Sequence, residues 1–514
     1  MNSKKLSILN LVLLSTGSVL GAGWLFSPYY GYQTAGIWVI LSWIIAIILT
    51  GCIALTFAEV ICILPVVGGV ARFIGISNNR TLAFIFLSLG WLSYVVYLPV
   101  EVQSLIQYLG FFKPSLIKVA GDQYQLSSQG LILASIIILL LTLFNCLMLK
   151  KIVIANSIVS VWKIIVPIFV ALVIICFYGK WHNFQLNYIN IKFSLSNVLY
   201  AIINSGIAFA FTGFQNSLIL ANNSENPSKA MPYSLLSALI ICGFIYILLS
   251  IAFIFGISSP KSLNTSIAAP LLGLVSLTGF HFLYSLLFID AIIAPLGTAN
   301  VFTSITARIL YGLGKDYWPK SILTLVNKFQ APYVALFISG FLGLLFLLPM
   351  PTWKELVSFL SSIVVFVYLS GPISLLIFNK ELPDVPRTFK LKLPILFGYL
   401  GFICCCLLIY WSGLNNLKFL LITIVSIIGF YIYVFKRNKI IETFLEAYDI
   451  LLLSLTLLII SFLKDINYIK FPYDNLLIVF FSCIYCFIIY KNRLVSSEIQ
   501  NNFELMKKEI QEEL

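Results

Sequence analysis

Long apolar stretches alternate with short polar segments along the whole chain. Most of these stretches hold about 20 residues or more, the length that an α-helix needs to cross a bilayer. None of the polar segments between them is long enough to form a folded domain. The pattern predicts an all-α polytopic membrane protein with about fourteen transmembrane helices. The predicted spans are residues 6–30, 36–64, 81–109, 129–149, 152–178, 196–221, 232–257, 270–308, 332–348, 356–378, 393–411, 417–435, 449–463 and 476–490.

Composition supports this interpretation, and charge predicts an orientation. Of the 514 residues, 60% are hydrophobic and 10% are charged, and the mean hydropathy is +1.01, far above that of soluble domains. Most of the 32 Lys and Arg residues fall in segments on the same side of the membrane as the N-terminus. The positive-inside rule therefore predicts two cytoplasmic termini. The net charge of +13 does not indicate nucleic acid binding, because no soluble domain exists to carry a basic face.

Two further compositional features bear on location. The first apolar run is too long and too aromatic for a cleaved signal peptide, so we expect it to remain as a span. The bias toward Ile, Asn and Lys is typical of AT-rich bacterial genomes, which favours a bacterial inner membrane.

The cysteines and histidines predict neither a metal centre nor a cofactor. All ten cysteines fall in predicted spans or at their ends, where cysteine acts as a small apolar residue. A metal or redox role for Cys483 and Cys486 would need nearby histidines, yet His182 and His281 lie near the predicted outer ends of other spans. No nucleotide-binding loop or nucleophile motif is present. The sequence therefore indicates neither an enzyme nor a primary pump.

Glycines interrupt the first and the sixth predicted spans. Gly21 and Gly23 lie in the first and Gly213 in the sixth, although glycine is about 1 kcal/mol worse than alanine inside a helix. Backbone groups without partners are not tolerated against lipid, so we expect broken helices whose free groups face a ligand. The alternative is close helix packing, because Gly17 and Gly21 fit the small-xxx-small pattern. The two spans cross the membrane in opposite senses, which favours an inverted repeat.

The sixth span places aromatic and polar side chains around its glycine. Phe209, Phe211 and Phe214 are candidates to wall a pocket, and Thr212 and Gln215 are candidates for polar contacts. The positive end of a broken helix suits the carboxylate of an amino acid, and free carbonyls suit its ammonium. The two breaks together predict an amino acid binding site.

Charged side chains inside spans usually face a cavity or a partner. Lys163 lies about 18 Å past Lys151 on a regular helix with ~1.5 Å rise per residue, and so near the midplane. A buried lysine can gain and lose a proton during a cycle, and we favour this role for Lys163 over a static structural one. Asp290 is a candidate partner for Lys163 or for a substrate ammonium, or else a protonated packing residue. Glu101 is expected to be a wetted vestibule carboxylate near the outer end of its span, and Glu59 to be structural.

Four segments, taken in order, resemble the amino acid-polyamine-organocation transporters, and together they cover about the first ten spans. The resemblance implies a leucine-transporter-type fold with two inverted repeats of five helices. It also implies secondary transport of amino acids or related amines. The segments are Gly21-Ala-Gly-Trp-Leu-Phe, Phe57-Ala-Glu-Val-Ile-Cys-Ile-Leu-Pro-Val-Val-Gly-Gly, Phe209-Ala-Phe-Thr-Gly-Phe-Gln with Asn226-Pro227 and Pro232, and Thr306-Ala-Arg-Ile-Leu-Tyr-Gly-Leu-Gly-Lys-Asp-Tyr-Trp-Pro-Lys.

The resemblance further implies a role for individual residues. Backbone N–H groups of the first break would bind the substrate, phenylalanines of the sixth span would line or gate the site, and its glycine turn would contribute carbonyls. A lysine at the place of Lys163 is proposed to do in proton-coupled members what sodium does in relatives. The substrate-binding candidates are Ser18, Gly21, Ala22, Gly23, Phe209, Phe211, Thr212 and Gly213.

Three departures from the family pattern limit this transfer. Gln215 stands where the family often has Glu, and Asn222 and Asn223 stand where it often has an acidic pair. Ala22 stands where it often has Ser, which removes a hydroxyl contact to the substrate carboxylate. A coupling role assigned to the family Glu therefore does not carry over to this chain. The candidate proton-coupling positions are Lys163, Asp290, Gln215 and Glu101.

The sequence as a whole predicts a proton-coupled symporter of amino acids that works by alternating access. Residues 1–380 would form the ten-helix core, with repeats at about 6–178 and 196–378, followed by further spans in 381–490 and a cytoplasmic tail in 491–514. The expected partners are an amino acid, protons and the bilayer, with homo-oligomers left open. The alternatives are an exchanger without proton coupling and a receptor that binds an amino acid without moving it.

Overall fold

The computed structural model describes residues 7–63, 70–120, 123–147, 152–190, 192–216, 226–258, 268–348, 350, 352–437 and 439–513. Asn222, Asn223 and the end of the second-span motif lie outside this set. Helices dominate, as expected for a chain whose apolar windows must satisfy their own backbone groups in lipid. The helices are α1 (Ile8–Val19), α2 (Gly23–Ala35), α3 (Val39–Ile63), α4 (Ile74–Ser77), α5 (Arg80–Gly110), α6 (Ser128–Leu147), α7 (Ile152–Val173), α8 (Trp181–Asn190), α9 (Leu195–Asn204), α10 (Ile207–Ala210), α11 (Pro227–Gly256), α12 (Pro270–Ser276), α13 (His281–Tyr317), α14 (Tyr333–Phe346), α15 (Trp353–Tyr368), α16 (Ser370–Glu381), α17 (Pro394–Trp411), α18 (Leu414–Phe435), α19 (Ile440–Glu446), α20 (Tyr448–Asp465), α21 (Tyr473–Lys491) and α22 (Ser496–Glu513).

Within the described residues, 10 helices are long and apolar enough to cross a membrane, or up to 12 if each of two bent pairs is one span. The bent pairs are α9 with Ile207–Asn216, at 52°, and α19 with α20, at 66°. The number is below fourteen because α1 and α14 are short, and because α2 and α3 form one apolar run of 41 residues. The chain is thus a multi-pass membrane protein, and a total of fourteen spans stays a prediction.

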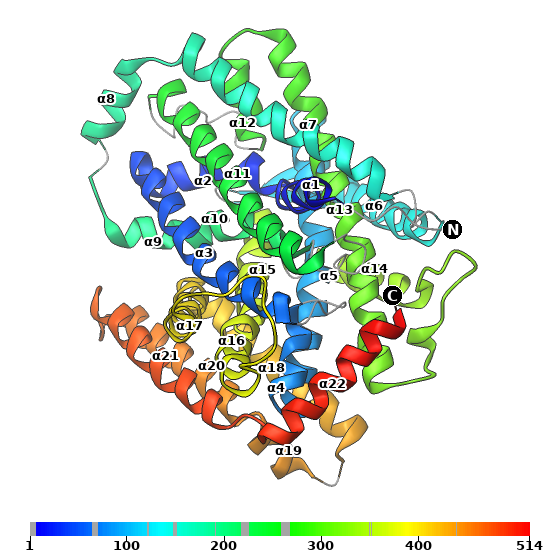
Figure 1. The fold of residues 1–514 in the computed structure, drawn as a ribbon. Helices are drawn as coiled ribbons and strands as arrows, with labels where there is room; N and C mark the ends of the chain where they lie inside the picture. Colours follow the sequence, from blue (N-terminus) through cyan, green and yellow to red (C-terminus); the bar gives the residue numbers. More distant parts are fainter. Residues whose placement is uncertain are drawn as a thin grey trace.

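The span made by α15 and α16 lies at the centre of the protein. Its most apolar window is 100% buried, and α5, α17 and α18 pack around α15. Along their lengths α5 packs on α13, and α3 on α11. The four helices α17, α18, α20 and α21, which follow this central span, lie together on one side of the molecule (Figure 1).

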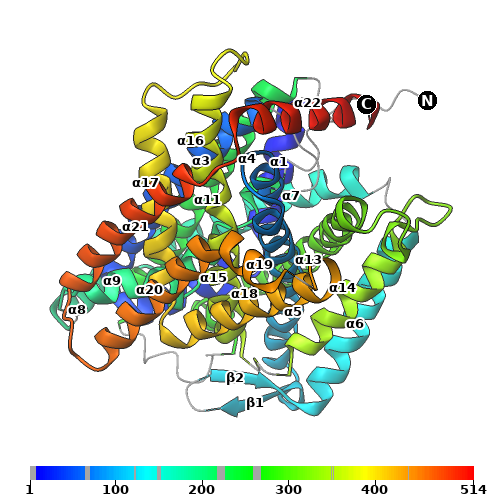
Figure 2. The ribbon, with the colours of Figure 1, turned by 90° about the horizontal axis from the view of Figure 1, so that it is seen from below.

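One feature departs from the all-helical prediction. The segment between α5 and α6 forms an antiparallel hairpin of β1 (Ile117–Ala120) and β2 (Gln123–Leu126). Gln125 of β2 also forms a bridge with Thr352, which caps the N-terminus of α15. Figure 2 shows the hairpin at one end of the molecule and α22 at the opposite end. These are called the hairpin end and the α22 end below.

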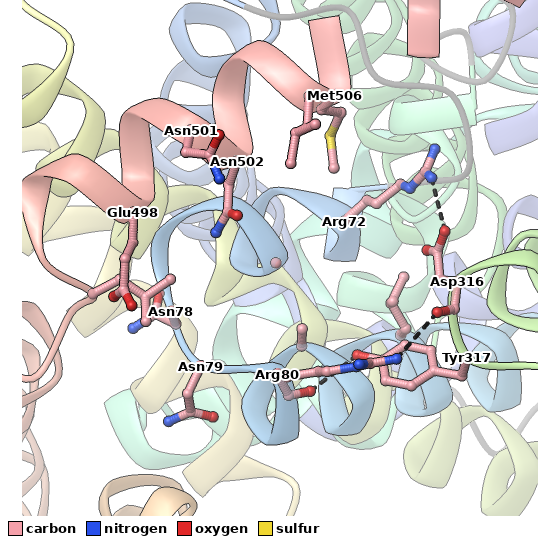
Figure 3. A pocket seen from close by; sticks show the side chains of 15 residues that line it. Arg72, Asn78, Asn79, Arg80, Asp316, Tyr317, Glu498, Asn501, Asn502 and Met506 are labelled. Carbon is pink, nitrogen blue, oxygen red and sulfur yellow. Dashed lines mark hydrogen bonds and ion pairs between the residues drawn. The ribbon is translucent and has the colours of Figure 1, made fainter. Parts of the chain in front are cut away.

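At the α22 end, the C-terminal helix lies across the ends of other helices. Its side chains Ile499 and Phe503 are buried, although the segment reads as a charged tail. Arg493, just before α22, forms an ion pair of 2.8 Å with Glu381 at the end of α16. A cavity of about 740 Å³ lies beneath α22, where Arg72 pairs with Asp316 at 2.9 Å (Figure 3).

A third ion pair at the α22 end is fully buried. Glu59 of α3 contacts Arg387 of the loop after α16, and their side chains are 0% and 2% exposed. The other carboxylate oxygen of Glu59 accepts the N–H of Leu391 at 2.9 Å. Arg387 also donates to the carbonyls of Phe378 and Leu382, at 3.1 and 3.0 Å. The expectation that Glu59 is structural agrees with these contacts, which hold this loop on α3.

Candidate functional site: two broken helices

The first span breaks between α1 and α2. Leu20 leaves helical geometry with φ −79° and ψ 71°, and α2 begins only at Gly23. The N–H of Gly21 bonds to the carbonyl of Val19 at 2.9 Å, which closes a tight turn. Ala22 is 0% exposed, so the break is enclosed by protein. This agrees with the principle that irregular backbone at membrane depth must be buried in protein or line a cavity.

Glu101 of α5 binds directly to this break. Its Oε2 accepts the N–H of Ala22 at 2.8 Å. A Cβ at residue 21 would lie 2.3 Å from Glu101 Oε1, so only glycine admits the carboxylate there. Glu101 is 1% exposed, and the prediction of a wetted vestibule position was therefore wrong. It failed because position along a span does not reveal which face of the helix meets the broken backbone.

The sixth span breaks at two places. α9 ends at Asn204, and Gly206 adopts the left-handed region with φ +75° before the short α10. Gly213 is also left-handed, with φ +103°, as its place in the sequence had suggested. Sequence reasoning missed Gly206, although Ser-Gly in an apolar run is a local signal for a break. Ser27 of α2 donates to the carbonyl of Gly206 at 2.8 Å, which links the two broken spans.

The two breaks lie against each other. The Tyr246 hydroxyl of α11 lies 2.7 Å from the carbonyl oxygen of Ala210 and 3.3 Å from that of Val19. The Tyr246 hydroxyl therefore contacts carbonyl oxygens at the ends of both α10 and α1. Gly23, the first residue of α2, lies against Ala210, and the backbone of Ser18 lies against Gly213. Tyr246 was missed because nothing in its sequence context separates it from other span tyrosines.

Lys163 of α7 reaches the C-terminal turn of α1. Its Nζ donates to the carbonyl of Gly17 at 3.0 Å and to Thr298 Oγ1 of α13 at 2.7 Å. Thr298 Oγ1 lies in turn 3.3 Å from the carbonyl oxygen of Leu20. Lys163 is 2% exposed. The ammonium therefore lies among oxygens of α1 and α13, in the kind of environment that suits a small cation. Thr298 had no sequence signal, being one of many span threonines.

Asp290, also on α13, is 0% exposed. Neither carboxylate oxygen has a hydrogen-bond partner among the described residues. No ion pair within 4.0 Å joins Asp290 to Lys163 in the described part of the chain. An unpartnered buried carboxylate is costly to ionise, which keeps both predicted roles open.

The two phenylalanines predicted to line the site have different surroundings. Phe209 contacts Tyr97 and Trp353, with ring centroids 5.8 and 5.9 Å away. Phe211 instead packs between Trp43 and Tyr246, at 5.7 and 5.6 Å.

The polar candidates Ser18 and Thr212 use their hydroxyls locally. Ser18 donates to Leu14 O at 2.8 Å and Thr212 to Phe209 O at 2.6 Å. Both hydroxyls therefore donate within their own helical turns.

Gln215 is the centre of a separate hydrogen-bond network. Its Oε1 accepts the Tyr368 hydroxyl at 2.8 Å and the N–H of Gly213 at 3.1 Å. Its Nε2 donates to the Tyr94 hydroxyl at 2.9 Å. Among the described residues Gln215 forms no hydrogen bond with Lys163, and its amide holds the glycine turn in place.

Comparison with known proteins places this chain in a family. The family model described as amino acid permease matches residues 6–430. The chain is 27% identical over 504 residues to the glutamate/serine transporter AimA of Bacillus subtilis, covering 94% of this chain and 92% of that protein. It is 28% identical over 429 residues to the aspartate-proton symporter of the same organism, covering 81% of each.

A third relative has a different transport mode. The arginine/agmatine antiporter of Chlamydia pneumoniae is 26% identical over 477 residues, covering 87% of this chain and 94% of the antiporter. Symporters and antiporters therefore both occur among the relatives. Because the family match extends from the first broken span into α18, this chain belongs to the amino acid permease family, whose members are transporters and not enzymes.

Proposed function

We propose that this permease is a proton-coupled amino acid symporter with a leucine-transporter-type fold. In this proposal residues 1–380 form two inverted repeats, at about 6–178 and 196–378, with the broken spans α1–α2 and α9–α10 as equivalent first helices. Residues 381–490 add further spans, and both termini are cytoplasmic. The meeting of two broken spans of opposite sense supports the repeats, and the charge asymmetry supports the orientation.

The substrate would bind where the two breaks meet. The break at Gly21, Ala22 and Gly23 would offer N–H groups to its carboxylate once Glu101 releases that of Ala22. The end of α10 would offer its ammonium the carbonyl of Ala210, which Tyr246 now contacts. The names of relatives support an amino acid as substrate, since they include a glutamate/serine transporter and an aspartate-proton symporter.

The contacts of Lys163 are the observation that supports proton coupling. The charged ammonium holds the carbonyl of Gly17 in α1 and the hydroxyl of Thr298 in α13. A deprotonated amine would hold them less strongly, because hydrogen bonds from a charged donor are roughly twice as strong as neutral ones. Loss of the proton would thus free α1 to move relative to α13, which couples protonation to alternating access.

Glu101 supplies a second coupling step. Its carboxylate takes the Ala22 N–H that a substrate carboxylate would need, and two carboxylates at one site repel each other. Protonation of Glu101 would weaken its hold on Ala22 and remove the repulsion. Substrate and proton would therefore bind together. Asp290 is an additional coupling candidate, as a partner for Lys163 or for the substrate ammonium.

Transport measurements test the role of Lys163. Labelled amino acids are offered to proteoliposomes with and without an inward proton gradient, for the native chain, Lys163→Gln and the exposed-site control Lys418→Gln. We expect gradient-driven accumulation for the native protein and the control, and a loss of at least about tenfold for Lys163→Gln, because coupling depends on its ammonium. Uptake only into amino-acid-loaded vesicles, insensitive to pH, would identify an exchanger, and binding without flux a receptor.

Equilibrium binding tests the role of Glu101. As pH rises, more Glu101 is ionised and competes with the substrate carboxylate, so the native affinity should fall. Glu101→Gln cannot ionise, and its affinity should change little between pH 5 and pH 8. Binding of labelled substrate to purified protein at several pH values measures both. If the affinity of Glu101→Gln falls with pH as steeply as that of the native protein, this role is contradicted.

A further inference from the structure

An apolar groove runs along the membrane-facing surface between α5, α13, α14 and α18. It has a volume of about 480 Å³, and its exposed rim includes Ile422 and Phe430, which are 61% and 51% exposed. Volumes of about 300 to 1,000 Å³ are typical of small-molecule sites. The groove does not include any residue of the two broken spans. Its lining residues are Phe84, Ser88, Trp91, Leu92, Leu310, Leu313, Trp318, Leu323, Ile338, Ile422, Thr423, Ser426, Ile427 and Phe430.

The groove contains few free polar groups. Thr423 and Ser426 donate to carbonyls of their own helix at 2.7 and 2.8 Å, and the Trp91 indole donates to Ser339 at 3.0 Å. The hydroxyls of Thr423 and Ser426 and the indole of Trp91 therefore have partners inside the protein. What remains toward the bilayer is a hydrocarbon surface, which suits an acyl chain.

The groove reaches the membrane boundary at the α22 end. Phe84 belongs to the first turns of α5, and Trp318 directly follows α13. The centroid of the Trp318 ring lies 5.0 Å from that of the Phe435 ring and 6.1 Å from that of the Phe430 ring. Tryptophan and other aromatic residues at this depth are typical of the interface between hydrocarbon and headgroups.

Two cations flank this aromatic boundary. Lys320 lies two residues after Trp318, and Arg437 lies two residues after Phe435. Both side chains are exposed, and neither makes an ion pair with any residue that the structure describes. The acidic groups nearby are already paired, since Glu446 binds Lys436 at 2.5 Å. The mouth of the groove is therefore positively charged without an internal counter-charge.

We propose that the groove is a binding site for an anionic phospholipid, with one acyl chain between α5, α13 and α18 and the phosphate of the headgroup near Lys320 and Arg437. Basic residues between transmembrane helices on the cytoplasmic side are a recurring way to bind anionic headgroups. The site uses neither Lys163 nor Glu101. It therefore does not depend on proton coupling, and it rests on the proposed orientation only for the leaflet that supplies the lipid.

Native mass spectrometry of the purified full chain tests this site. Phosphatidylglycerol and phosphatidylcholine of equal chain length are titrated separately into the native protein, Lys320→Gln/Arg437→Gln and Ser426→Trp. We expect one phosphatidylglycerol to bind more tightly than phosphatidylcholine. Affinity should fall about fivefold for each cation removed. Ser426→Trp should weaken both lipids, because the indole fills the groove.

Matched controls separate the site from general effects. Val425→Trp places the same side chain on a lipid-facing position of α18 that does not line the groove, and Lys418→Gln removes a cation at the other end of that helix. Both should bind phosphatidylglycerol as the native protein does. Equal binding of the two lipids, or phosphatidylglycerol binding unchanged in both groove variants, would overturn the proposal. A native dimer that Ser426→Trp converts to a monomer would also overturn it, by assigning the groove to a second copy of the chain.

Discussion

At the scale of residues, single atoms decide which side chains reach the backbone of the helix breaks. Gly21 lacks the Cβ that would lie 2.3 Å from Glu101, and so a carboxylate approaches a free N–H inside the membrane. Sequence identified Gly21 and Lys163 because glycine inside a helix and charge inside a span are costly, and it identified Ala22 through the family motif. It did not identify Thr298 or Tyr246. Their side chains have no unusual local sequence context, and their roles depend on contacts with residues far along the chain.

Replacing Gly21 tests this close approach. In Gly21→Ala the new methyl group would overlap Glu101, and a forced shift in a packed interior costs about 1–3 kcal/mol. We expect uptake in proteoliposomes to fall by about tenfold or more, with a smaller change in thermal stability. Gly51→Ala is the matched control, because a Cβ at Gly51 meets nothing within 4 Å. Normal uptake by Gly21→Ala would show that Glu101 and the break need not be this close.

At the scale of elements, loops bind helices more firmly than their sequences suggest. The loop between α16 and α17 carries Arg387 into a fully buried pair with Glu59. Likewise, Arg493 pairs with Glu381 before α22 begins. Neither pair was predicted, because the partners are more than a hundred residues apart and loops give no periodic signal. The helices themselves were predicted well, since an apolar window of about 20 residues has few alternatives in a bilayer.

The buried pair gives a stability prediction. Arg387→Gln leaves the Glu59 carboxylate buried without its counter-charge, which typically costs about 3–5 kcal/mol. We expect a clear loss of unfolding free energy in detergent, measured by a denaturant titration with a fluorescence readout. The double variant Glu59→Gln/Arg387→Gln should recover part of the loss. If the single variant is as stable as the native protein, the pair does not hold the loop on α3.

At the scale of the whole molecule, the hairpin and α22 mark opposite ends (Figure 2). The proposed orientation places α22 in the cytoplasm and the hairpin outside. Sequence predicted this from the distribution of Lys and Arg, since basic segments are retained on the cytoplasmic side. The hairpin itself was missed, because two strands of four residues are too short to stand out between long apolar runs.

Epitope accessibility tests this orientation. A tag inserted between β1 and β2 should be detected on intact spheroplasts, whereas a tag after Leu514 should be detected only after permeabilisation. The physical reason is the excess of basic residues at the α22 end, which opposes translocation. The reversed pattern would contradict the proposed orientation, while leaving the family assignment unchanged.

The sequence by itself determined the membrane location, the family, the approximate positions of the helices and the presence of broken spans. The family follows from four motifs in order along the chain. The other three follow from local costs that a single window reveals: apolar length, charge in lipid and glycine in a helix. Only the tertiary structure decided which groups meet at the breaks. Three sets of hydrogen bonds there join distant segments. Glu101 accepts from Ala22, Lys163 donates to Gly17 and Thr298, and the Tyr246 hydroxyl contacts the carbonyls of Val19 and Ala210. Such contacts depend on how helices rotate and pack, and no local pattern of residues specifies that.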